Sequence, residues 1–277
     1  MFLRRVIEHV KKQHWTAVFL DFVIVVLGVF IGIQVSNWNA ARAQRVAAAD
    51  FHERLLTDMR LEEFNYRVIE TYYRDAQKAA ETAYKGLTGE IELSDAELLI
   101  NTFRGSQYNW MERHRSTFDE LVASGNFDLI ADTELRTIIT GYFAATYLED
   151  LSRDNRNSEY RVEFRKTIPP GLHESLNEQC GDKQIEGAPL GAMTLGYPCA
   201  LELPSENISD AVAALRSNEN LLPALRLHIV NLSSWNFTLE TNYTAYKLGT
   251  FKQHGGAAED HCAAPPSCLN VPSWYAV

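Results

Sequence analysis

Residues 16–36 read TAVFLDFVIVVLGVFIGIQVS, and residues 22–33 within them include no polar side chain. A helix of about 20 residues rises about 30 Å, which matches the hydrocarbon thickness of a bilayer. Trp15 and Trp38 flank the stretch, where the aromatic belts of the two membrane interfaces would lie. The sequence therefore predicts a transmembrane helix over residues 15–38.

The distribution of basic residues predicts the orientation of this helix. Only Arg42 and Arg45 closely follow the apolar stretch, whereas four basic residues precede it. Because Lys and Arg are retained in the cytoplasm, we expect residues 39–277 to be exported. In a bacterium, this topology corresponds to an inner-membrane protein with a periplasmic domain. The four preceding residues, which we also expect at the membrane interface, are Arg4, Arg5, Lys11 and Lys12.

Residues 1–14 have the pattern of a short amphipathic helix on the cytoplasmic side. Apolar residues repeat at helical spacing and charged residues fill the other side, so the helix is expected to lie in the inner leaflet. A cleaved signal peptide is the competing interpretation, because Ala41 and Ala43 give a small-x-small cleavage pattern. The apolar stretch is longer than a signal core, which favours a retained anchor.

One face of the predicted transmembrane helix carries residues suited to contact another helix. Gly28 and Gly32 form a GxxxG motif, which lets two backbones approach closely. Asp21 falls within about 20° of both glycines around the helix axis. A carboxylate in a membrane must be shielded by protein or reach the interface. We predict that the three residues share a contact with a membrane protein partner or a second copy; the alternative is that Asp21 extends to the cytoplasmic edge.

Residues 39–85 contain neither Gly nor Pro, which predicts that the helix continues out of the membrane. An apolar stripe with alternating three- and four-residue steps follows this segment and is interrupted by Glu62. Packing within a helical bundle explains the stripe most economically, and a parallel coiled-coil dimer is the alternative. The stripe consists of Leu55, Met59, Tyr66, Ile69, Tyr73, Ala76, Ala80 and Ala83.

Capping signals predict further helices. Ser94 and Glu97 have the spacing of a capping box, and Thr117 and Glu120 repeat it. Gly125 is a suitable left-handed residue to end the second of these helices.

The rest of the exported part is expected to alternate long helices with irregular chain. We predict helices over residues 132–166 and 221–246, an irregular loop over 169–207 and a non-helical tail over 252–277. The fold class is therefore all-α: a transmembrane helix continuing into a domain that resembles a four-helix bundle, with an irregular, disulfide-bearing C-terminal part.

The cysteines all lie in the part expected to be exported. An oxidising compartment favours disulfides, and proximity favours Cys180 with Cys199 and Cys262 with Cys268. Binding of a metal by His254, His261 and Cys262 is the weaker alternative, because the spacing matches no closed zinc site. No metal and no cofactor is expected.

Composition and motifs restrict the function. The chain carries a net charge of −10, of which residues 1–38 contribute +2 and the remainder −12, so nucleic-acid binding is disfavoured. No common nucleophile, nucleotide or zinc-hydrolase motif occurs. Trp110, Glu112 and His114 are candidate ligand-binding residues between two helices, or else part of an ordinary connection. His228 shares an apolar face, which predicts a hydrogen-bonded core histidine rather than a catalyst.

The stretch from VIEHVKKQHW (residues 6–15) through IQVSNWN (33–39) resembles the N-terminus of a family of bacterial single-pass membrane proteins with a domain of unknown function. Residues 118–126, FDELVASGN, are similar to a second part of it. The resemblance implies a bacterial origin and the topology described above, but no activity and no catalytic residues. We therefore expect a non-enzymatic interaction protein, an accessory subunit or scaffold of a membrane assembly; the alternative is an extracytoplasmic sensor or a helical bundle that binds a small ligand.

Overall fold

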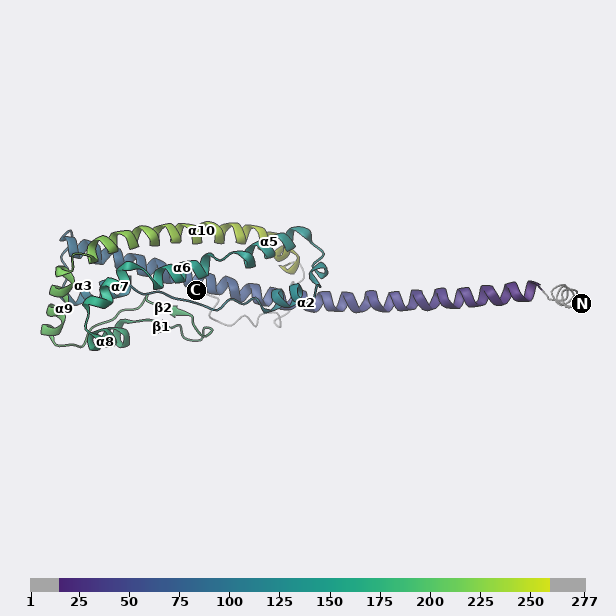
Figure 1. Ribbon diagram of the computed structural model, residues 1–277, viewed down its shortest axis with the longest axis horizontal. Coiled ribbons are helices and arrows are strands. Elements are labelled where there is room, and N and C mark those ends of the chain that lie inside the picture. The colour runs from purple at the N-terminus through teal and green to yellow at the C-terminus, as the bar shows by residue number, and fades with distance from the viewer. Residues whose placement is uncertain (1–14, 260–277) are drawn as a thin grey trace, which may run out of the picture.

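The computed structural model describes residues 15–259, and these are mostly helical. Two helices are much longer than the others, α2 (Trp15–Thr88) and α10 (Leu221–Glu259). α2 projects from a head as a straight rod, and within the head α10 lies along it and runs in the opposite direction (Figure 1). The all-α prediction is confirmed, whereas a four-helix bundle is not, since the other helices of the described part are short.

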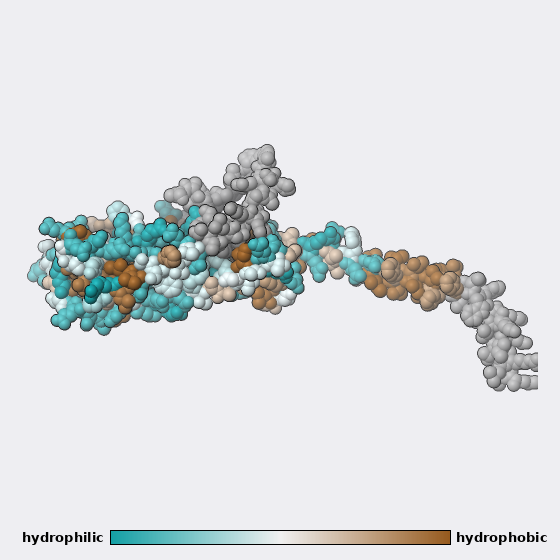
Figure 2. Space-filling view, turned by 90° about the horizontal axis from the view of Figure 1, so that it is seen from above, coloured by the Kyte–Doolittle hydropathy of each residue, from teal (hydrophilic) through white to brown (hydrophobic). Residues whose placement is uncertain are grey.

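α2 joins the apolar segment to the head without a break. It has 74 residues, which correspond to about 110 Å at 1.5 Å per residue. The side chains of residues 24–46 are all exposed, and the first buried side chain is that of Phe51. The apolar part of the rod is separated from the head by a section of alanines and scattered polar residues, residues 39–50, which we call the stalk (Figure 2).

Short helices fill the space around the two long ones, and a two-stranded antiparallel ribbon lies beside them. The helices are α3 (Asp95–Gly105), α4 (Ser116–Ala123), the 3-10 turn η1 (Phe127–Leu129), α5 (Thr133–Ala144), α6 (Tyr147–Arg156), α7 (Glu159–Thr167), α8 (Pro170–Cys180) and α9 (Ser205–Ser217). The ribbon pairs β1 (Lys183–Gln184) with β2 (Met193–Thr194).

The prediction of one long helix over residues 132–166 is wrong, because the chain forms three shorter helices there, α5, α6 and α7. At the first break, the guanidinium of Arg113 binds the carbonyl oxygen of Ala145. At the second, Ser158 acts as an N-cap and accepts a hydrogen bond from the backbone N–H of Arg161. A polar side chain therefore satisfies backbone groups at each interruption.

The capping predictions have mixed outcomes. Ser94 and Glu97 form the predicted capping box, and Gly125 has the predicted left-handed backbone, with φ of +69°. The box predicted at Thr117 is wrong, since α4 already begins at Ser116. Asp58 of α2 caps this helix instead, and its carboxylate accepts the backbone N–H of Thr117 at 3.0 Å.

The C-terminal half is more regular than expected. Residues 169–207 contain α8 and the ribbon, because Pro170 occupies the first turn of a helix, where its missing N–H is tolerated. α10 continues to Glu259, so the tail expected from residue 252 is helical over its first eight residues. The predicted Cys180–Cys199 disulfide is present, with Cα atoms 5.4 Å apart. Cys262 and Cys268 lie outside the described residues.

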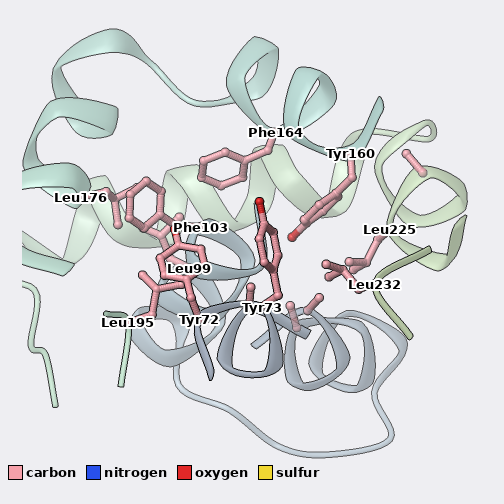
Figure 3. Close-up of a cluster of buried hydrophobic side chains, with 14 of the residues drawn as sticks. Tyr72, Tyr73, Leu99, Phe103, Tyr160, Phe164, Leu176, Leu195, Leu225 and Leu232 are labelled. Carbon is pink, nitrogen blue, oxygen red and sulfur yellow. The ribbon is translucent and has the colours of Figure 1, made fainter. Parts of the chain in front are cut away.

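The stripe on α2 is buried as predicted and contributes to two apolar clusters. The stalk-side cluster includes Leu55 and Met59 with residues of α4 and α5. The far cluster begins at Tyr66 and fills the rest of the head, where aromatic rings from α2, α3 and α7 meet leucines of α10 (Figure 3). Glu62 lies between the clusters on α2 and is itself only 1% exposed.

Candidate functional site

The face of α2 predicted to contact another helix lies on the exposed, apolar part of the rod. Asp21 is exposed, and a Cβ placed on Gly28 or Gly32 would have no neighbouring atom within 4 Å. Among the described residues, one helix is long and apolar enough to cross a membrane, and its apolar window is not buried by the head. A second helix therefore has free access to both glycines.

The predicted interface residues are only partly described. Trp38 is 59% exposed and ends the apolar part of the rod. Trp15 begins α2, but only its backbone is described. Arg4, Arg5, Lys11 and Lys12 lie outside the described residues.

The stalk sets the distance between the apolar segment and the head. Its twelve residues correspond to about 18 Å of helix, and their side chains are mostly exposed. The remaining helix, from Phe51 to Thr88, forms the backbone of the head. The head is thus attached to the apolar segment by a continuous helix rather than by a loop.

Trp110, Glu112 and His114 lie in the connection between α3 and α4. Trp110 is 57% exposed, and Glu112 is also exposed. This connection is held against α2 largely by its backbone: the carbonyl of Glu112 accepts a hydrogen bond from Asn65 at 3.1 Å, and the N–H of His114 donates one to Glu62. The geometry supports the interpretation of an ordinary interhelical connection.

Arg113, the neighbour of the predicted residues, has the strongest interactions of this connection. Its Nε lies 2.6 Å from Oε2 of Glu62, and its guanidinium packs over the ring of Tyr142. The Tyr142 hydroxyl donates to the same carboxylate at 2.6 Å. Desolvation opposes the charge on Arg113, but Tyr142 and Glu62 outweigh it and raise its pKa. These three residues therefore join α2, the α3–α4 connection and α5, which is a structural role.

His228 is a core histidine, as predicted. It is 3% exposed, and its Nε2 lies 2.9 Å from the carbonyl oxygen of Gly105, which can only accept a hydrogen bond. Burial lowers the pKa of His228 to about 4, so the ring is neutral near pH 7. This histidine ties α10 to the end of α3.

A second candidate site was not predicted from the sequence. It is a hollow bounded by α2, α3 and residues 195–198, with Asp75 and Arg104 in its wall. The disulfide between Cys180 and Cys199 holds the chain next to it. These groups are far apart in the sequence, so the cysteine pair was the one signal that could have indicated their proximity.

Comparison with known proteins identifies no relative: no protein-family model, no curated protein and no solved structure matches this chain. The resemblance of the anchor to a bacterial membrane-protein family therefore stays a prediction.

Proposed function

We propose that this protein is a membrane-anchored interaction protein, a non-enzymatic accessory subunit or scaffold. Its membrane helix would join a membrane assembly, or a second copy of the chain, through the face that contains Asp21, Gly28 and Gly32. The head would be presented to partners at a fixed height above the bilayer by the continuous helix α2.

The proposed location is the bacterial inner membrane, with the N-terminus in the cytoplasm and the head in the periplasm. Two observations support it. Basic residues are concentrated before the apolar stretch, as expected for a cytoplasmic end. The Cys180–Cys199 disulfide suits an oxidising compartment such as the periplasm.

The proposed contact rests on one observation: the carboxylate of Asp21 lies on the same side of the helix as two uncovered glycines, Gly28 and Gly32. Nothing in the head covers Gly28 or Gly32, so a partner helix can approach its backbone closely there. Asp21 lies nearly two turns away on the same side. A partner helix with a polar residue at the matching depth would shield this carboxylate from lipid.

The test replaces both glycines with leucine in the full-length protein, extracted from membranes in mild detergent. Native gel electrophoresis and mass spectrometry of co-purifying proteins would measure assembly. The Gly28→Leu/Gly32→Leu variant is expected to lose the complex, because the side chains keep the backbones apart. The mass of the parent complex would distinguish a second copy from another protein.

The matched control replaces apolar residues on the opposite face of the same helix. Val26→Leu/Phe30→Leu keeps the apolar character of the span and is expected to leave the complex intact. If the glycine variant migrates with the same partners as the parent protein, the proposed contact is wrong.

A further inference from the structure

A hollow of about 240 Å³ opens on the head beside the disulfide. Its wall combines charged and polar side chains from α2 and α3 with a short segment that follows β2. Its lining includes Asp75, Lys78, Arg104, Gly196 and Tyr197.

Arg104 is held in a fixed position at this hollow. Its Nε donates to the carbonyl of Cys180 at 3.1 Å, and its Nη1 donates to the carbonyl of Tyr197 at 2.9 Å. The guanidinium also stacks on the Tyr197 ring, 4.5 Å from its centroid. Its Nη2, by contrast, is buried and has no hydrogen-bond partner among the described residues. An unpaired donor on a buried charged group is costly, so this nitrogen calls for an acceptor.

Asp75 provides a carboxylate in the same wall. It is half-buried and makes no hydrogen bond or ion pair within the described residues, not even with Arg104. Burial raises the pKa of Asp75, against the opposing effects of Lys78 and Arg104. A Cβ on residue 196 would lie 2.9 Å from Oδ2 of Asp75, so Gly196 leaves the space that this carboxylate occupies. Asp75 therefore lacks a cationic partner that its surroundings would favour.

The segment that forms the far wall is fixed by several contacts. The Cys180–Cys199 disulfide anchors it two residues beyond Tyr197, and the Tyr197 hydroxyl donates to the carbonyl of Gly181. The ammonium of Lys183 lies 3.9 Å from the centroid of the Tyr197 ring. The wall is thus built before any ligand arrives, which reduces the entropy lost on binding.

We propose that this hollow binds a small zwitterion with one carboxylate and one ammonium group, the chemistry of a free α-amino acid. The ligand carboxylate would bind Arg104, with Lys78 nearby, and the ligand ammonium would bind Asp75. A simple anion would be repelled by the carboxylate of Asp75, and a simple cation would be repelled by the guanidinium of Arg104. A zwitterion satisfies both groups at once, and this inference does not depend on the proposed membrane contact.

The test uses the full-length protein in mild detergent and the standard L-amino acids as probes. A thermal-shift screen selects the amino acid that stabilises the protein most, and titration calorimetry then measures its Kd. Two analogues with the same side chain are measured in parallel. The primary amine keeps the ammonium group, and the carboxylic acid keeps the carboxylate. We expect the amino acid to bind at least about tenfold more tightly than either, since each removes a charged hydrogen-bonding partner.

Variants assign the two ends of the ligand. Asp75→Asn, which keeps the shape of the side chain, is expected to raise the Kd of the amino acid about tenfold or more and to abolish its advantage over the carboxylic acid. Arg104→Gln is expected to abolish its advantage over the amine. Arg153→Gln is the control: it removes an exposed charge that pairs with Asp150 on the surface and should leave Kd unchanged.

Three results would overturn the proposal: no amino acid stabilises the protein, the carboxylic acid binds as tightly as the amino acid, or Asp75→Asn leaves Kd unchanged. Arg104 also supports the fold through two backbone carbonyls, so circular dichroism must show that its variant is folded. If that variant unfolds, Asp75→Asn and the charge-deleted ligands still decide the question.

Discussion

Glu62 and Arg113 form an ion pair in the interior of the head, with 2.6 Å between Oε2 and Nε. The side chains are 1% and 10% exposed, respectively. The pair lies between the stalk-side and far clusters, where the apolar stripe of α2 is interrupted. It therefore links α2 to the connection that precedes α4.

Removing one partner of this pair should strongly destabilise the head. Within the described residues, Glu62→Gln leaves the buried guanidinium of Arg113 with the more distant Glu149, at 3.4 Å, as its anionic partner. We expect the free energy of unfolding to fall by about 3–5 kcal/mol, measured by urea titration of the full-length protein in detergent. The double variant with Arg113→Met should lose less than the sum of the single variants.

A surface pair supplies the control for this prediction. Arg74 and Glu70 are an i,i+4 pair on the same helix, with the Arg74 side chain 65% exposed. Arg74→Met should change the unfolding free energy by no more than about 0.5 kcal/mol. An equally small effect of Glu62→Gln would show that the buried pair does not stabilise the head.

Two glycines should respond to alanine in opposite directions. A Cβ on Gly105, at the end of α3, would lie 2.8 Å from Cα of Ala80 in α2, so Gly105→Ala forces the helices apart and should cost about 1–3 kcal/mol. Gly141 lies within α5 with no atom near its added Cβ, so Gly141→Ala should stabilise by about 0.5–1 kcal/mol through helix propensity. Thermal unfolding of the two variants, side by side, measures the difference; a higher midpoint for Gly105→Ala would contradict the close approach of α2 and α3.

His228 should make the stability of the head depend on pH. Burial lowers its pKa to about 4, whereas the unfolded chain takes up a proton near pH 6.5. Its contribution is therefore fully present above about pH 6.5 and is lost as the pH falls towards 4, for a total of about 3 kcal/mol. Urea midpoints measured across this range should decline. His228→Gln can still donate to Gly105 but does not titrate, so the decline should become shallower; an unchanged slope would assign it to other groups.

The disulfide should contribute through the loop that it closes. Cys180 and Cys199 are 19 residues apart, so the Cys180→Ala/Cys199→Ala variant should lose about 3 kcal/mol of stability. Peptide mapping without reduction identifies the bond in the parent protein. A reductant should destabilise the parent to a similar degree; any further loss that it causes in the variant would come from Cys262 and Cys268.

Features encoded by local patterns were predictable from the sequence. The unbroken helix after the apolar segment follows from the absence of Gly and Pro, and the buried stripe follows from helical periodicity. The breaks within residues 132–166 were missed in part because one of them depends on Arg113, about thirty positions earlier, binding the carbonyl of Ala145. Periodicity contains no information on such a contact.

The candidate sites differ in the same way: one is formed by residues close together in the sequence, and the other by residues far apart. Asp21, Gly28 and Gly32 share a helix, so their common face follows from helical geometry alone. The hollow combines Asp75 and Arg104 with a segment more than ninety residues later in the chain. Only the folded head brings these groups together.

The continuity of α2 has a mechanical consequence. The apolar segment and the head share one helical axis, and the stalk between them contains no glycine or proline that could act as a swivel. Turning the apolar segment about its axis turns the head through the same angle, and a single residue inserted into the stalk would rotate the head by about 100°. Any partner that bound the Asp21 face, as proposed above, would therefore also set the rotational orientation of the head.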